Sequence, residues 1–318
     1  MDQEKPLLRS LVPAAFAAPA LLAGQPRYRG DQLRAWVFAQ GAFAWERMTN
    51  LPRAWRESLA TRWDLAALAR VERQVSTDGT RKFLFRLRDG NTVESVIIPM
   101  DRHATFCVST QVGCAMACRF CATARGGLVR NLEAGEIIEQ VQRLAADLAA
   151  EPLPDRGGRA FNVVFMGMGE PLDTWETVAA SIEIMTHPEG LGMSRRRIQI
   201  STSGPRAGLE QLLAAAPGVG LTLSLGGADD AARRRLMPVP GRTPVAEAVS
   251  LAARYARKTG RRVTVAWVLI AGATDDPEQA RLLAALLAGG PFKVNLIPMN
   301  ELHDDDLTRP DAGRTLAF

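Results

Sequence analysis

Cysteine is scarce in this sequence of 318 residues, and its four copies are confined to positions 107–121. Disulfide-stabilised secreted domains are short and spread their cysteines along the chain, so this distribution excludes that class. In a reducing compartment, clustered cysteines more often serve a metal or catalysis. Histidine is scarcer still, with His103, His187 and His303 as its three copies. No fourth ligand therefore stands near the cysteines to complete a zinc site.

A long uninterrupted apolar run is also missing. The longest early stretch, residues 11–24, is broken by two prolines and falls short of the ~20 apolar residues that a membrane helix needs. Asp2 and Glu4 stand where a secretory signal would be basic. We therefore expect a cytoplasmic protein with no membrane partner, and a monomer by default.

The composition is that of a globular chain with a modest excess of positive charge. Apolar residues make up 47% and charged residues 23%, which excludes a disordered chain. The formal net charge is +5. Two interpretations of this charge stay open: an anionic partner such as a nucleic acid, and arginine faces that are simply solvated.

Residues 1–66 predict a small helical domain. Apolar residues recur at helical spacing within 28–38, with Asp31 as a candidate N-cap, and a second helix is expected over 52–62. The domain carries nine Lys or Arg against six Asp or Glu. It is either a helical bundle with a polar face or an appendage that docks RNA.

Residues 67–103 predict a β-hairpin extension, and residues 104–318 predict an α/β core. The hairpin is expected from β-forming residues at 82–87 and 93–99 around a turn at 89–91. In the core, strand-like and helix-like runs alternate, which favours a parallel sheet with helices outside and chemistry at the carboxyl ends of the strands. The expected strands are 106–110, 162–166, 197–201, 221–225, 262–270 and 293–298, and the expected helices are 133–149, 174–186, 206–215, 243–259 and 276–288.

Three cysteines form a Cys-x-x-x-Cys-x-x-Cys run, at Cys114, Cys118 and Cys121. Three thiolates on one loop can each ligate an iron of a 4Fe–4S cluster and leave the fourth iron open. Zinc is less favoured because it takes four closed ligands. The remaining alternative is three buried cysteines that pack as small apolar side chains.

Other polar motifs follow the expected strands. Residues 166–171, Met-Gly-Met-Gly-Glu-Pro, combine glycines that admit a ligand close to the backbone with a carboxylate that can accept from an ammonium group. Residues 201–204, 224–226 and 295–300 offer hydroxyls and amides suited to a ribose and a carboxylate. Each motif alone is equally a turn or a cap. The arginine runs 195–197 and 233–235 fit either phosphate or a solvated face.

Taken together, these motifs resemble the RlmN/Cfr family of radical S-adenosylmethionine (radical-SAM) adenosine methyltransferases. The resemblance covers nearly the whole chain and implies a partial (β/α)6-type barrel with a small N-terminal helical domain and a β-hairpin extension. It rests on residues 48–52, 107–114, 118–124, 130–132, 167–171, 201–204 and 295–298.

The resemblance implies methylation of an adenosine carbon, with carbon 2 favoured over carbon 8, in ribosomal RNA, tRNA or both. It implies a 4Fe–4S cluster on the three cysteines of the run, S-adenosylmethionine, and an electron donor such as flavodoxin or ferredoxin. It also implies Glu94 as a proton acceptor and Cys107 as the thiol that resolves a protein–RNA adduct. The implied S-adenosylmethionine contacts are Gly169, Glu170, Ser201, Ser224, Leu225, Gly226 and Asn300.

The sequence departs from this family at two places. The family usually has His where this chain has Gly226. It also continues past the equivalent of Phe318 to a cysteine that carries the methyl group, whereas no cysteine follows Cys121 here. The family's C-terminal tail is therefore expected to be lacking, either because the sequence is a fragment or because this protein does not use the carrier cysteine. Two alternatives stay open: a radical-SAM relative without methyl transfer, and a non-catalytic relative that binds RNA.

Overall fold

The computed structural model describes residues 5–153, 160–239, 243–300, 302 and 306–318, and His303 lies outside them. The chain forms two compact units. The first unit comprises residues 1–110, 131–167 and 176–198, and the second comprises 111–130, 168–175 and 199–318. The expected boundaries at 66 and 103 stay a prediction.

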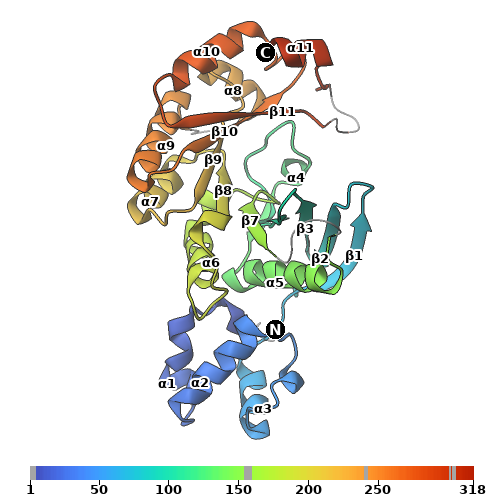
Figure 1. Cartoon of the computed structure of the whole chain (residues 1–318), viewed down its shortest axis with the longest axis vertical. Coiled ribbons are helices and arrows are strands. Elements are labelled where there is room, and N and C mark those ends of the chain that lie inside the picture. The colour runs from blue at the N-terminus through green and yellow to red at the C-terminus, as the bar shows by residue number, and fades with distance from the viewer. Residues whose placement is uncertain (1–4, 154–159, 240–242, 301, 303–305) are drawn as a thin grey trace. The chain divides into compact units, whose positions relative to one another are not determined.

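The first unit begins with short helices, drawn in blue in Figure 1. The expected second helix is confirmed as α3 (Arg53–Arg62). The first helix starts earlier than predicted, as α2 (Arg27–Arg34), and continues through a π-helical turn, Ala35–Ala39. Asp31 is therefore not its N-cap, because Pro26 precedes the first turn with an extended backbone. The remaining short elements are η1 (Leu8–Ser10), η2 (Pro13–Ala17), α1 (Pro19–Leu22) and η4 (Trp45–Arg47).

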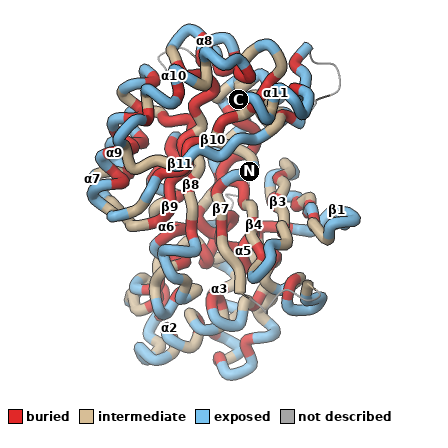
Figure 2. Tube along the Cα trace, turned by 45° about the horizontal axis from the view of Figure 1, so that its top comes forward, coloured by how far each residue is buried: buried red, intermediate tan, exposed pale blue. Residues whose placement is uncertain are grey.

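The sheet of the first unit has the order β1-β2-β3-β4-β7. Its strands are β1 (Ala69–Val75), β2 (Arg81–Arg86), β3 (Thr92–Pro99), β4 (Ala104–Cys107) and β7 (Phe161–Phe165). The first four pair antiparallel, and β4 pairs parallel with β7. The predicted hairpin is confirmed as β2 and β3, whereas β1 was not predicted because it mixes polar and apolar residues that are almost all exposed (Figure 2).

Two helices of the expected core also belong here, α5 (Ala134–Ala150) and α6 (Trp175–Thr186). Helix α5 begins with a capping box, in which the Glu133 and Glu136 side chains satisfy backbone N–H groups reciprocally. Its buried Gln140 accepts hydrogen bonds from Ser95 in β3 and from the Ser109 backbone N–H. The helix therefore packs against the face of the sheet that carries Ser95.

The second unit repeats a strand followed by a helix, as predicted. Strands β8 (Ile198–Thr202), β9 (Gly220–Ser224), β10 (Val263–Leu269) and β11 (Phe292–Pro298) are parallel to their neighbours. The expected helices are α7 (Arg206–Ala215), α9 (Val245–Thr259) and α10 (Pro277–Leu287). Two further helices were not predicted, α8 (Asp230–Leu236) and α11 (Ala312–Ala317). Among the described residues, no helix is long and apolar enough to cross a membrane.

A short ribbon precedes these strands in the second unit. Strands β5 (Gln111–Gly113) and β6 (Leu128–Asn131) form a separate two-stranded sheet, with α4 (Ala122–Arg125) between them. The expected strand 106–110 is thus displaced toward the N-terminus, as β4. The segment that contains the three clustered cysteines connects the two strands of this ribbon.

Candidate functional site

The cysteine loop, residues 114–127, is closed at its base by a contact between backbones. Cys114 donates its N–H to the Gly127 carbonyl at 2.8 Å. Gly113 has a φ of +74°, and a Cβ there would lie 1.9 Å from the Gly127 oxygen. Only glycine fits this position, because any other residue meets both backbone strain and a clash. The close approach brings the two ends of the loop together.

The middle of the loop is held by contacts with residues 236–270 of the same unit. Arg119 donates its backbone N–H to the Leu236 carbonyl at 2.9 Å, at the end of α8. Cys118 and Phe120 pack against a buried apolar cluster that includes Met237 and Ile270. Burial of Phe120 against this cluster holds the loop by the hydrophobic effect. The loop is therefore held in place by a backbone hydrogen bond and by apolar packing.

All four cysteines are unbridged, and the three on the loop differ in exposure. Cys114 is buried, whereas Cys118 and Cys121 are partly exposed. Burial is the largest cause that raises the pKa of Cys114, to about 11, and the Met116 backbone N–H partly offsets it. Without a metal, Cys114 is therefore a neutral thiol at pH 7.

The donor set fits an iron–sulfur cluster better than a single ion. Among the described residues, no three His, Cys, Asp or Glu side chains converge on one point as ligands of one ion. Thiolates that each bind a different iron of a cluster need no such convergence. Three sulfur donors on one anchored loop, with no fourth cysteine in the second unit, match a cluster that keeps one iron open.

Glu170 is the buried carboxylate of the predicted site, and protein donors surround it. Its Oε1 accepts from the Leu172 N–H at 3.0 Å and from Thr202 Oγ1 at 2.6 Å, and its Oε2 accepts from the Ser203 N–H at 2.7 Å. Burial raises its pKa, and these hydrogen bonds act in the opposite direction. Its own N–H donates to Gln111 Oε1 at 2.8 Å. Glu170 thus joins β5, the segment 168–175 and the end of β8.

The structure brings the other predicted S-adenosylmethionine contacts to the carboxyl ends of the strands in the second unit. Ser201 lies at the end of β8 and Ser224 at the end of β9, both partly buried, and Leu225 is buried. Asn300 is exposed two residues after β11. Gly169 precedes Glu170 with a φ of +104°. The contacts themselves stay a prediction.

Gly226 occupies a position that does not readily accept a side chain. Its φ is +69°, and a Cβ would lie 2.4 Å from the Met237 sulfur. Met237 belongs to the apolar cluster that supports Phe120. A side chain at residue 226 would displace Met237, so the packing of this cluster requires a glycine there.

The sequence pattern did not reveal that Thr202 and Ser203 donate to Glu170, or that Arg233 is buried. Arg233 is buried, and its guanidinium donates to the carbonyl oxygens of Ser203 and Thr243. The treatment of 233–235 as one phosphate-binding or solvated run is therefore wrong for Arg233, although Arg234 and Arg235 are exposed. The signal was available, because Arg233 lies three residues before the apolar Leu236 on a helix.

Glu94 and Cys107 both lie in the first unit, on one face of its sheet. Cys107 in β4 is paired with Val96 in β3, and Glu94 lies two residues before Val96. Alternation along a strand places these three side chains on the same face. Lys82 of β2 forms an ion pair with Glu94 at 3.1 Å. Burial raises the pKa of Cys107 to about 11, opposed in part by the Met166 backbone N–H.

Comparison with known proteins defines the class first. Residues 108–284 match the family described as the radical SAM superfamily. A crystal structure of a radical SAM methyltransferase from Sphaerobacter thermophilus is similar over 98% of this chain and 90% of that one, with a TM-score of 0.90 and 39% identity. The α/β fold expected from the sequence is thereby confirmed. This class uses a 4Fe–4S cluster and S-adenosylmethionine, which are the cofactors that we assign to the chain.

Individual relatives identify the family within this class. The "Probable dual-specificity RNA methyltransferase RlmN" of Symbiobacterium thermophilum is 45% identical, over 93% of this chain and 78% of its own length. The "Dual-specificity RNA methyltransferase RlmN" of Anaeromyxobacter dehalogenans is 42% identical, over 100% of this chain and 85% of its own length. The chain belongs to the RlmN family of radical-SAM RNA methyltransferases.

Proposed function

We propose that the protein methylates carbon 2 of an adenosine in ribosomal RNA, tRNA or both. The observation that carries this proposal is the anchored loop with three thiols, in one unit with the buried Glu170 at the strand ends. Carbon 2 is the position that the resemblance to the RlmN/Cfr family favours over carbon 8, and the relatives carry the RlmN name. We further propose a cytoplasmic monomer, and the family resemblance implies that it receives electrons from a donor such as a flavodoxin or a ferredoxin.

Cys114, Cys118 and Cys121 would hold the 4Fe–4S cluster. When bound, the cluster and S-adenosylmethionine supply the one-electron chemistry that an sp² carbon of adenine requires, since that carbon is not nucleophilic. The chain contributes the support of the loop and the exclusion of water around Cys114. All three thiols must lose their protons to become ligands, so loading of the cluster releases protons.

Glu170 is the carboxylate that we assign to the ammonium group of S-adenosylmethionine. Leu172 and Thr202 donate to its Oε1 and the Ser203 backbone to its Oε2, and the Ser203 side chain is a further donor. The ammonium group would replace the Ser203 hydroxyl and form a charge-assisted hydrogen bond. Gly169, Ser201, Ser224, Leu225, Gly226 and Asn300 would then supply backbone and polar contacts to the rest of that molecule.

Glu94 and Cys107 are proposed as the catalytic residues. The carboxylate of Glu94 would accept the proton that leaves the methylated carbon. The Cys107 thiolate would attack the sulfur of the family's methyl-carrier cysteine, so that a disulfide forms as the bond from that sulfur to the new methyl carbon breaks and the carbon takes up a proton. Their shared face of the sheet supports this pairing of roles. A thiol with a raised pKa needs a base before it can attack.

The test is product formation by the reconstituted enzyme. The full-length protein, purified without oxygen and loaded with iron and sulfide, is incubated with S-adenosylmethionine, a reductant and unmodified RNA. We expect methyladenosine in the digested RNA by mass spectrometry, and none with Cys118→Ala. A preparation that cleaves S-adenosylmethionine but leaves every RNA unmethylated contradicts the proposal and favours radical chemistry without methyl transfer. RNA binding without any cleavage favours the non-catalytic relative.

A further inference from the structure

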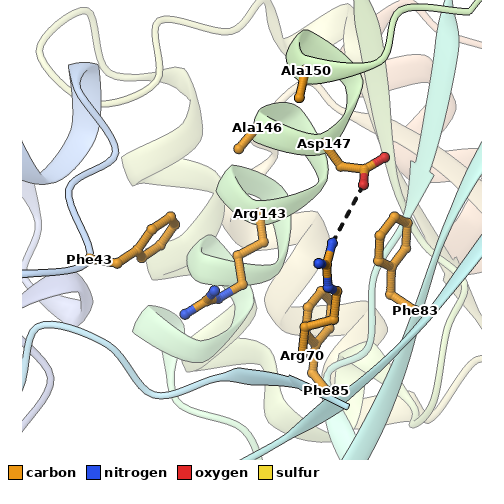
Figure 3. Close-up of a pocket in the computed structure, with 8 residues that line it drawn as sticks. All are labelled: Phe43, Arg70, Phe83, Phe85, Arg143, Ala146, Asp147 and Ala150. Atoms are coloured by element: carbon orange, nitrogen blue, oxygen red, sulfur yellow. Dashed lines mark ion pairs between the residues drawn. The ribbon is translucent and has the colours of Figure 1, made fainter. Parts of the chain in front are cut away.

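A cleft of about 470 Å³ lies in the first unit between α5 and the strands β1 and β2 (Figure 3). Phe83 and Phe85 of β2 form its floor, with ring centroids 5.8 Å apart and an interplanar angle of 6°, and each is only 1% exposed. Leu84 between them is paired with Glu94. The cleft therefore opens on the face of the sheet opposite Glu94, away from the proposed catalytic residues of this unit. Its volume is within the range of about 300–1,000 Å³ found for small-ligand sites.

Positive charge exceeds negative charge beside the cleft. Three arginines of β1 and β2 form ion pairs with two carboxylates of α5, Asp147 and Glu151. Arg81 is almost buried and lies 2.8 Å from Asp147. Arg70 lies 3.8 Å from the same carboxylate and its side chain is 57% exposed. Arg70 is thus the guanidinium that an incoming anion can approach through water.

The opposite wall presents a guanidinium stacked on an aromatic ring. Arg143 of α5 places its Cζ 4.3 Å from the centroid of the Phe43 ring. Glu139 fixes the other side of this guanidinium with an ion pair at 2.6 Å. In Figure 3, Arg143 extends from the helix toward Phe43. Arginine planes and aromatic rings are the surfaces on which proteins stack unpaired nucleobases.

We propose that this cleft binds one nucleotide of an RNA chain. The base would stack on the guanidinium of Arg143, which lines the cleft and is 23% exposed, with the phosphate at Arg70. A planar ligand that carries negative charge satisfies both the guanidinium plane and the excess of positive charge. The inference rests on the proposed action on RNA and extends it with a binding site outside the reaction centre. A free nucleotide shares this chemistry, so the test must separate the two sources.

Helix α5 provides a matched pair of variants. Ala146 is exposed and lines the cleft, whereas Ala149 is exposed on the same helix and does not line it. Ala146→Glu and Ala149→Glu add the same charge at helix positions that accept Glu readily. Similar thermal unfolding of the two variants shows that both are folded. A second pair is Arg70→Gln and Arg281→Gln, which remove one exposed arginine from β1 and from α10.

Binding is measured by fluorescence anisotropy of a labelled RNA stem–loop with an unpaired adenosine, on the reconstituted enzyme. We expect Ala146→Glu to raise Kd about fivefold or more through repulsion of phosphate, and Ala149→Glu to leave it near the wild-type value. The slope of log K against log salt measures the salt dependence of binding. Arg70→Gln should reduce the magnitude of this slope by about 0.7, and Arg281→Gln should leave it unchanged.

Other outcomes overturn the inference in distinguishable ways. Wild-type binding with equal Kd for Ala146→Glu and Ala149→Glu removes the cleft as an RNA site but leaves the proposed methyl transfer intact. Absence of RNA binding by the wild type removes both. Equilibrium dialysis with labelled AMP is the third arm: AMP binding that Ala146→Glu abolishes, together with unchanged RNA binding, assigns the cleft to a free nucleotide and contradicts the proposal.

Discussion

Thr202 donates a hydrogen bond of 2.6 Å from Oγ1 to the carboxylate of Glu170, and both side chains are buried. The bond joins the last residue of β8 to the segment that follows Gly169. Thr202 Oγ1 also accepts from the Gly204 N–H at 2.9 Å. The hydroxyl therefore fixes both the buried carboxylate and the turn after β8, where the proposed S-adenosylmethionine contacts begin.

Replacement of Thr202 by Val is expected to destabilise the protein by about 1.5–3 kcal/mol. The shape of the side chain is nearly retained, but a buried charge-assisted hydrogen bond is lost. Urea unfolding followed by circular dichroism measures the change. The control is Thr61→Val, whose exposed hydroxyl bonds to a neighbouring carbonyl and whose loss should cost less than about 0.5 kcal/mol. Equal effects in the two variants contradict the role given to Thr202.

Gly113→Ala is expected to prevent normal loading of the cluster. A Cβ at residue 113 would meet the Gly127 carbonyl, so the base of the cysteine loop must open. Gly126 is the matched control, because its φ is −83° and nothing lies within 4 Å of an added Cβ. Iron and sulfide per chain after reconstitution provide the measurement. Full loading of Gly113→Ala would show that the closed base is dispensable.

Arg233→Gln is expected to lower the free energy of unfolding by about 1–3 kcal/mol. The shorter side chain cannot reach both carbonyl oxygens, and buried acceptors are left without donors. Arg234→Gln, at the exposed neighbour, should change it by less than about 0.5 kcal/mol. If Arg234→Gln proves as costly as Arg233→Gln in chemical denaturation, the buried arginine is not a support of Ser203.

Cys107 is expected to react slowly with iodoacetamide at pH 7 and faster as the pH rises. Its pKa is raised to about 11, so the nucleophilic thiolate is rare at neutral pH. In a variant with the three loop cysteines changed to Ala, Cys107 is the sole thiol. The midpoint of its rate profile should lie near pH 11 when folded and near about 8.5 when unfolded in guanidinium. A folded midpoint equal to the unfolded one contradicts burial as the cause.

The core of the fold was predictable because its parallel strands are rich in apolar residues, which are buried in β8, β9 and β10 although largely exposed in β11. Strand β10, Val-Thr-Val-Ala-Trp-Val-Leu, illustrates this, and its expected range of 262–270 differs from the observed one by one residue at each end. Strand β1 was missed because its pairing depends on backbone hydrogen bonds, while nearly every side chain is exposed. A strand without a buried face leaves no alternating pattern to read.

The site was predictable only where its residues are adjacent in the sequence. The cysteine run and the segment 166–171 are local patterns. Thr202 and Ser203, by contrast, donate to Glu170 from more than 30 residues away, and Ser and Thr are ordinary residues at strand ends. The cleft beside Phe43 combines residues from four separate segments. Such sites arise from packing and have no local signature.

The central claim is methylation of carbon 2 of adenosine, and the fate of the hydrogen on that carbon tests it most directly. RNA made with adenosine deuterated at carbon 2, or at carbon 8, is treated with the reconstituted full-length enzyme, and the position of deuterium in the isolated methyladenosine is read by NMR and by fragmentation in the mass spectrometer. The account predicts a methyl group in place of the carbon-2 deuterium, whether or not that deuterium reappears in the methyl group, and deuterium still on the ring at carbon 8. A product that keeps deuterium at carbon 2 and loses it at carbon 8 contradicts the account.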